Sequence, residues 1–294
     1  MEAAQTTSVG HALEALVQPL WIYAVAALCV PTTVFVLLRI RQWWNSGRPL
    51  PLPLDRAMPA TPWPALAGLI LFAAMYALMM ALVLAWAAFG AAPADEDRRM
   101  FSPGVLLTMT LPALVGLAVV AFYGRRGLQA VGLRLGSVRA DLSYGVVAAV
   151  AVFPLCVAGL VVSSLVLVRV GLGPHQPELL HTVESAHEAH QYWPLALAIL
   201  EASLLAPLVE EFMYRGVLMV SLMKLMGAGG AIFGSSLLFA LAHARDQPQS
   251  VLSVFVLGLA FGYVAYRTRS LLASIVTHAL FNSVMVVGTF FGGG

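Results

Sequence analysis

The fold of this chain is decided by residues 193–217, WPLALAILEASLLAPLVEEFMYRGV, an apolar run that nevertheless carries Glu210, Glu211 and Arg215. A helix of about 20 apolar residues crosses the roughly 30 Å hydrocarbon core of a bilayer, and we expect one over 193–214. Similar runs occupy residues 19–38, 63–91, 104–123, 143–168, 230–244, 251–266 and 271–291. The pattern predicts an all-α, polytopic integral membrane protein with about eight transmembrane helices.

The composition of the chain agrees with a bilayer as its solvent. Of 294 residues, 60% are hydrophobic and 10% are charged, against roughly 25% charged in ordinary soluble domains. A net charge of +2, with the arginines in loops rather than in a stripe, argues against a nucleic-acid partner. The expected surroundings are the lipid bilayer and, if the chain is bacterial, the cell (inner) membrane.

The basic residues predict how the chain is oriented in the membrane. The segments after the first and third runs contain Arg39, Arg41, Arg48, Arg56, Arg125, Arg126, Arg134 and Arg139. Loops rich in arginine and lysine stay in the cytoplasm, and alternation along the chain brings Lys224, Arg267 and Arg269 to the same side. Both termini are then expected outside.

The chain divides by content into two parts. Residues 1–192 contain about four membrane helices with their connecting loops, and no chemical motif is recognisable in them. Residues 193–291 contain ionisable side chains inside apolar runs, where each is expensive and is a functional candidate by default. We therefore expect a helical catalytic core at 193–291, with an intramembrane catalytic cavity.

Helical spacing predicts how these side chains pair. Glu210 and Glu211 are adjacent, so they point about 100° apart on a helix and need separate partners. Arg215 follows Glu211 by four residues, which is the spacing of an intrahelical ion pair. Glu210 is thereby left free.

Two later runs each add a pair with the same spacing. Phe239 and His243 are four apart in LFALAHA, and His278 and Asn282 are four apart in THALFNS. At 1.5 Å per residue, the glycine turn at 227–230 lies about 26 Å from Glu210 and about 20 Å from His243. The turn before the last helix, however, is only about 14 Å from His278. The estimated depths in the membrane therefore agree for Glu210 and His243, but not for His278.

The residue types are suited to hydrolysis of an amide bond. A carboxylate in a low-dielectric pocket is a stronger base, so Glu210 is the natural acceptor of a proton from water. Imidazole and carboxamide groups can position that water and donate hydrogen bonds to a developing oxyanion. No serine or cysteine lies in a nucleophile motif. A structural polar network that holds helices together is the alternative interpretation.

The three motifs resemble those of the CPBP superfamily, the CAAX proteases and bacteriocin-processing intramembrane proteases, which includes the type II CAAX prenyl endopeptidases. The match consists of EExxxR at Glu210, Glu211 and Arg215, FxxxH at Phe239 and His243, and HxxxN at His278 and Asn282. It covers about residues 193–291, with the motifs in the order of the family and each on its own expected helix.

The resemblance implies a role for each motif residue. Glu210 with His243 would activate the water, and His278 with Asn282 would form the oxyanion site. The supporting residues that it implies are Glu211, Arg215 and Phe239. The implied mechanism is glutamic-type, so no cofactor is expected; zinc held by Glu210, His243 and His278 is the rival, although the HExxH motif is absent.

The sequence thus predicts an intramembrane endopeptidase that acts on a membrane-associated protein or peptide substrate. If the chain is bacterial, the target is a leader, a bacteriocin, an anchor peptide or a C-terminal sorting helix, because bacteria generally lack prenylated CAAX proteins. A non-catalytic scaffold, immunity or transport protein that uses the same buried groups is the alternative function.

Overall fold

A computed structural model describes residues 20–46, 61–89, 103–134, 138–170, 187, 192–245 and 247–292. Within these ranges the chain is helical and contains no strand, so the predicted all-α membrane fold is confirmed. The elements of the first half are α2 (Leu20–Asn45), α3 (Ala65–Phe89), α5 (Pro103–Phe122), α6 (Gly124–Ala130) and α7 (Val138–Arg169). Those of the second half are α9 (Tyr192–Leu200), η1 (Glu201–Leu205), α10 (Ala206–Glu211), η2 (Phe212–Met219), α11 (Val220–His243), η3 (Pro248–Ser250), α12 (Val251–Thr268) and α13 (Leu271–Gly292).

The described part of the chain has six stretches long and apolar enough to cross a membrane, and a shorter apolar helix at Leu106–Phe122. One of the six, Leu195–His243, has 49 residues and is too long for a single crossing. It reverses at Gly227, which has a φ of 70° that a residue with a side chain rarely adopts. The rings of Tyr214 and Phe239, far apart in this stretch, have centroids 5.0 Å apart. Within the described residues, each of the eight predicted runs coincides with a helix or with one arm of this reversed stretch.

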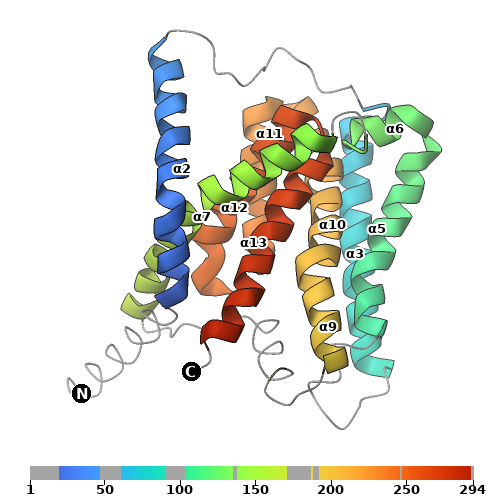
Figure 1. Cartoon of the computed structure of the whole chain (residues 1–294). Coiled ribbons are helices and arrows are strands. Elements are labelled where there is room, and N and C mark those ends of the chain that lie inside the picture. The colour runs from blue at the N-terminus through green and yellow to red at the C-terminus, as the bar shows by residue number, and fades with distance from the viewer. Residues whose placement is uncertain are drawn as a thin grey trace.

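Helix α7 is the centre of the bundle. It packs along α2, α12 and α13, while α3 packs along α5 and contacts the glutamate-bearing helix at η2. Figure 1 shows α2 at one side of the molecule and the pair α3 and α5 at the other, with α7 and α13 crossing between them. The helices that carry the three motifs thus lie side by side in the middle of the bundle.

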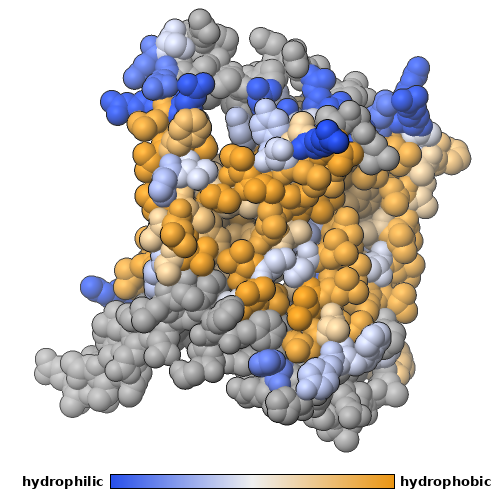
Figure 2. Space-filling model, in the orientation of Figure 1, coloured by the Kyte–Doolittle hydropathy of each residue, from blue (hydrophilic) through white to orange (hydrophobic). Residues whose placement is uncertain are grey.

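Hydrogen bonds tie several loops together at one edge of the bundle. Lys224 donates to the carbonyl oxygens of Thr61 and Trp63, just before α3. Arg134 donates to the carbonyl of Thr268, and the backbone N–H of Leu271 donates to Gly132. This is the edge at which α6 lies in Figure 1, and Figure 2 shows strongly hydrophilic side chains along it above a broad hydrophobic belt.

Candidate active site

The helix that carries the two glutamates is not a regular α-helix. It contains two π-helical segments, η1 and η2, on either side of Glu210 and Glu211. In η1 the N–H of Ala206 donates to the carbonyl of Glu201, five residues back. The next donor in that register would belong to residue 207, which is a proline and has no N–H. The carbonyl of Ala202 is therefore left for another donor. Such π-helical turns often occur at functional sites.

Asn282 on α13 supplies this donor. Its Nδ2 atom donates to the carbonyl oxygen of Ala202 at 2.9 Å. A carboxamide has two N–H groups, so one remains for another acceptor. The bond links α13 to the glutamate helix at the place where Pro207 interrupts the backbone ladder. This contact explains the position of Asn282 without reference to chemistry.

Glu211 and Arg215 form the predicted intrahelical ion pair. Nη1 of Arg215 lies 3.1 Å from Oε1 of Glu211, and both side chains are completely buried. Nη2 of Arg215 donates to the carbonyl of Gly258 on α12 at 3.1 Å. A buried charge is tolerated when it is paired and hydrogen-bonded. The two charges are paired, but among the described residues Oε2 of Glu211 and Nε of Arg215 have no hydrogen-bond partner.

Aromatic rings surround the Arg215 guanidinium. Its central carbon lies 4.6 Å from the ring centroid of Phe239 and 5.0 Å from that of Phe261, with Tyr214 at 5.9 Å. A desolvated cation over a ring face gains about 2 kcal/mol, so these rings take the place of water around the charge. Phe239 was predicted next to His243, and their ring centroids are 4.6 Å apart. Its contact with Arg215 was not predicted.

Gly258 is required by the close approach of α11 and α12. A Cβ atom at this position would lie 3.0 Å from the Cβ of Ser236 and 3.3 Å from Nη2 of Arg215. A side chain would therefore separate the two helices and displace the guanidinium from the carbonyl that it binds. The sequence signal is the spacing of the two glycines in GLAFGY, which is typical of close helix packing.

His278 joins the ion pair to the rest of the site. Its Nδ1 atom lies 3.1 Å from Oε1 of Glu211, which accepts from both His278 and Arg215. The imidazole is stacked on Phe261, with ring centroids 4.5 Å apart and an angle of 25° between the planes. Packing and one hydrogen bond thus fix the ring, and Nε2 remains directed at Glu210, 3.7 Å from its Oε2.

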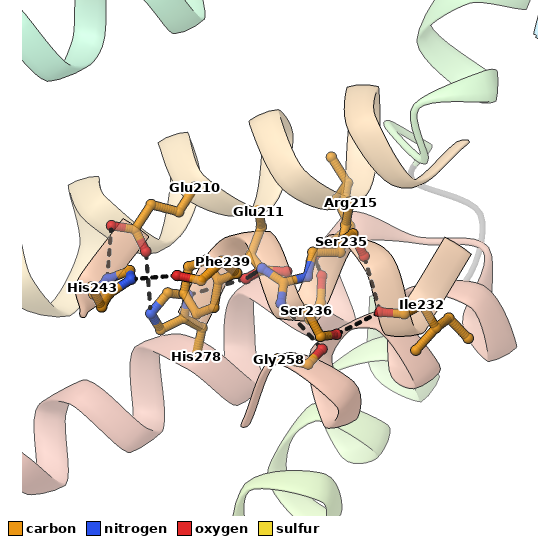
Figure 3. A network of polar contacts seen from close by, with 12 residues as sticks. Glu210, Glu211, Arg215, Ile232, Ser235, Ser236, Phe239, His243, Gly258 and His278 are labelled. Atoms are coloured by element: carbon orange, nitrogen blue, oxygen red, sulfur yellow. Dashed lines mark hydrogen bonds and ion pairs between the residues drawn. The ribbon is translucent and has the colours of Figure 1, made fainter. Parts of the chain in front are cut away.

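Glu210 lies between two imidazole rings. Its Oε1 is 4.0 Å from Nε2 of His243 and its Oε2 is 3.7 Å from Nε2 of His278. Nδ1 of His243 bonds the carbonyl of Phe239 at 2.8 Å. Figure 3 shows His243 and His278 at the end of the network where Glu210 lies, and Gly258 toward the end where Arg215 lies. The three motifs thus meet in one network.

Six of the seven predicted residues belong to this network. They are Glu210, Glu211, Arg215, Phe239, His243 and His278. The seventh, Asn282, donates to the backbone carbonyl of Ala202 in η1. In the described part of the chain, no group of three or more His, Cys, Asp or Glu is arranged as a metal site.

These features define a class: an integral membrane protein with a paired, partly buried acid and imidazole site between its last helices. Residues 192–284 match the family described as type II CAAX prenyl endopeptidase Rce1-like. The match supports a protease, and it confirms the resemblance carried by the three motifs. No curated protein and no solved structure gives a significant match.

Proposed function

We propose that this protein is an intramembrane endopeptidase that hydrolyses a peptide bond of a membrane-associated protein or peptide, using water activated by Glu210. The observation that carries the proposal is the position of Glu210 between two imidazole nitrogens, at 3.7 and 4.0 Å. These separations are too long for direct hydrogen bonds and suit a bridging water.

The hydrogen bond of His243 to the backbone determines which of its nitrogens faces Glu210 as an acceptor. A carbonyl oxygen only accepts, so Nδ1 of His243 must carry the proton that it donates to Phe239. The neutral ring then offers a lone pair at Nε2, opposite the Glu210 carboxylate. Two acceptors 4.0 Å apart are satisfied together by one water that donates a proton to each. Such a water is oriented for attack.

The proposed reaction is direct addition of water to the scissile carbonyl. Glu210 takes a proton from the water as its oxygen bonds to the carbonyl carbon, and negative charge develops on the carbonyl oxygen. Glu210 then returns the proton to the amide nitrogen, the C–N bond breaks, and a carboxylic acid and an amine are released. No covalent intermediate and no cofactor are required.

His278 and Asn282 are the proposed oxyanion donors. His278 donates from Nδ1 to Glu211, so it acts as an oxyanion donor as the imidazolium cation, whose Nε2 also carries a proton. Stacking on Phe261 preorganises this Nε2 at the site. Asn282 uses one N–H for Ala202 and has a second available. Removing one donor of this type typically lowers kcat by about 10²–10³.

The proposal is tested by mapping protein termini in membranes of the native host. Wild type is compared with Glu210→Gln and with the matched control Glu201→Gln, which alters a second buried acid on the same helix that lies outside the network. A set of cleaved termini should disappear in Glu210→Gln and persist in Glu201→Gln at equal protein levels. If the termini are unchanged in Glu210→Gln, the buried acids belong to a scaffold or transport role.

A further inference from the structure

The polar network is sealed at one end and open at the other. The side chains of Arg215 and Glu211 are 0% exposed, and that of His278 is 5% exposed. Exposure then rises to 18% for Glu210 and 27% for His243. Because exposure increases along the chain of contacts, the network opens beside His243 and is closed beside Arg215. The network therefore has a closed end at Arg215 and an open end at His243.

The open end of the network lies at the end of α11 that is far from the turn at Gly227. His243 is the last residue of α11, and the arm of α11 after Gly227 runs antiparallel to α12, since Ile232 meets Gly262 and Ser236 meets Gly258. Continuing this register places His243 beside the beginning of α12. At 1.5 Å per residue, the 16 residues from Gly227 to His243 measure about 24 Å. The open end of the network is thus remote from the turn at Gly227.

The opposite end of the bundle carries most of the described positive charge. The tied loops of that edge, together with the end of α2 and the start of α7, carry Arg39, Arg41, Arg125, Arg126, Arg134, Arg139, Lys224, Arg267 and Arg269. Among the described residues outside the network, only Arg169 and Arg245 lie at the other end. Arg48, Arg56, Arg98 and Arg99 are outside the described residues.

This asymmetry orients the protein. Short loops rich in arginine and lysine are retained in the cytoplasm, which makes the edge with α6 cytoplasmic (Figures 1 and 2). The end of α11, with His243 and the turn at Arg245, then faces the other side.

We propose that water and substrate reach Glu210 from the extracytoplasmic side of the membrane. The substrate is then a membrane-anchored protein or peptide whose cleaved bond lies on the outer side of its anchor. The inference rests on the proposed endopeptidase activity for its substrate, and on the exposure gradient and the charge asymmetry for its direction.

Cysteine labelling in intact cells tests the orientation independently of activity. Cys29 and Cys156 are first replaced by alanine, and Arg245→Cys is compared with Arg126→Cys, both exposed positions at opposite ends of the bundle. A charged, membrane-impermeant maleimide should label Arg245→Cys in intact cells, and Arg126→Cys only after permeabilisation. The reverse pattern, or labelling of neither variant until the cells are opened, overturns the proposal.

The positions of the cleaved bonds supply the second readout. Termini that depend on Glu210 should map to the extracytoplasmic flank of the membrane anchor of each substrate, and the impermeant maleimide should abolish them in Arg245→Cys but not in Arg126→Cys. Termini that depend on Glu210 but map to cytoplasmic flanks overturn the direction and leave the endopeptidase intact. If no terminus depends on Glu210, it is the proposed function that fails.

Discussion

Glu210 and Glu211 are neighbours in the chain and lie in opposite surroundings. Glu211 is completely buried, and a single oxygen of its carboxylate accepts from both Arg215 and His278. Glu210 is partly exposed and faces His243 and His278 only at water-bridging distances. The difference shows that the EExxxR motif combines two halves: a sealed half that fixes the geometry of the helices, and an open half with a free carboxylate.

The largest effect is expected in the open half of the network. Glu210→Gln and His243→Ala should each lower turnover by about 10²–10⁴, because each removes a group that binds the same water. The double variant should be scarcely slower than either single one, since residues that act as a unit are not additive. The measurement is cleavage of a peptide spanning a mapped bond by purified protein in nanodiscs.

Independent contributions would contradict this account. If the rate losses of the two single variants multiply in the double variant, Glu210 and His243 do not share a water. Glu201→Gln provides the control, because Glu201 is a buried acid on the same helix and should leave turnover close to that of wild type.

Substitutions in the sealed half, at Glu211 and Arg215, should mainly lower the free energy of unfolding. Glu211→Gln leaves Arg215 buried without its counter-charge, and breaking such a pair lowers the free energy of unfolding by about 3–5 kcal/mol. The change is measured by denaturation in mixed micelles. Replacing both partners, with Glu211→Gln combined with Arg215→Met, should recover part of the loss, because no unpaired charge then remains. A double variant less stable than Glu211→Gln alone would contradict the pairing.

A smaller effect separates the two roles of Asn282. Asn282→Ala should lower the free energy of unfolding by about 1–3 kcal/mol, the penalty for a buried carbonyl without a partner. In a Pro207→Ala background the loss should shrink, because residue 207 regains the N–H that the helix lacks. Turnover should fall by about 10²–10³ in both backgrounds if the second N–H of Asn282 binds the oxyanion. Equal stability losses in the two backgrounds would refute the link to Pro207.

The smallest change is expected on removal of metal. With Glu210 acting as the base, treatment with EDTA or 1,10-phenanthroline should leave turnover of the purified protein unchanged. Loss of activity that zinc restores would favour the rival site at Glu210, His243 and His278. Metal content of the purified protein, measured by mass spectrometry, provides the second readout.

Contacts within one helix could be predicted from the sequence because helical geometry fixes them. The Glu211–Arg215 ion pair and the Phe239–His243 contact both follow from a spacing of four residues, and both are present. The membrane fold and its helical runs follow from apolar length in the same way.

Contacts between helices depend on tilt and on where each turn lies, which the sequence does not specify. The depth estimate separated His278 from Glu210 by about 12 Å along the helix axes at 1.5 Å per residue, yet Nε2 of His278 lies 3.7 Å from the carboxylate. The partner of Asn282 was missed for another reason: it is a backbone carbonyl, released by a proline inside a π-helical turn. Pro207 is visible in the sequence, and it was the available signal.

The measurement that tests the central claim most directly compares Glu210→Gln with Glu211→Gln in the same preparation, recording turnover and unfolding for each. The two-half account predicts that Glu210→Gln unfolds like wild type and has lost turnover, whereas Glu211→Gln unfolds much more easily. A Glu210→Gln variant that keeps its turnover, or that loses it only in proportion to lost folding, would contradict the claim that Glu210 performs the chemistry.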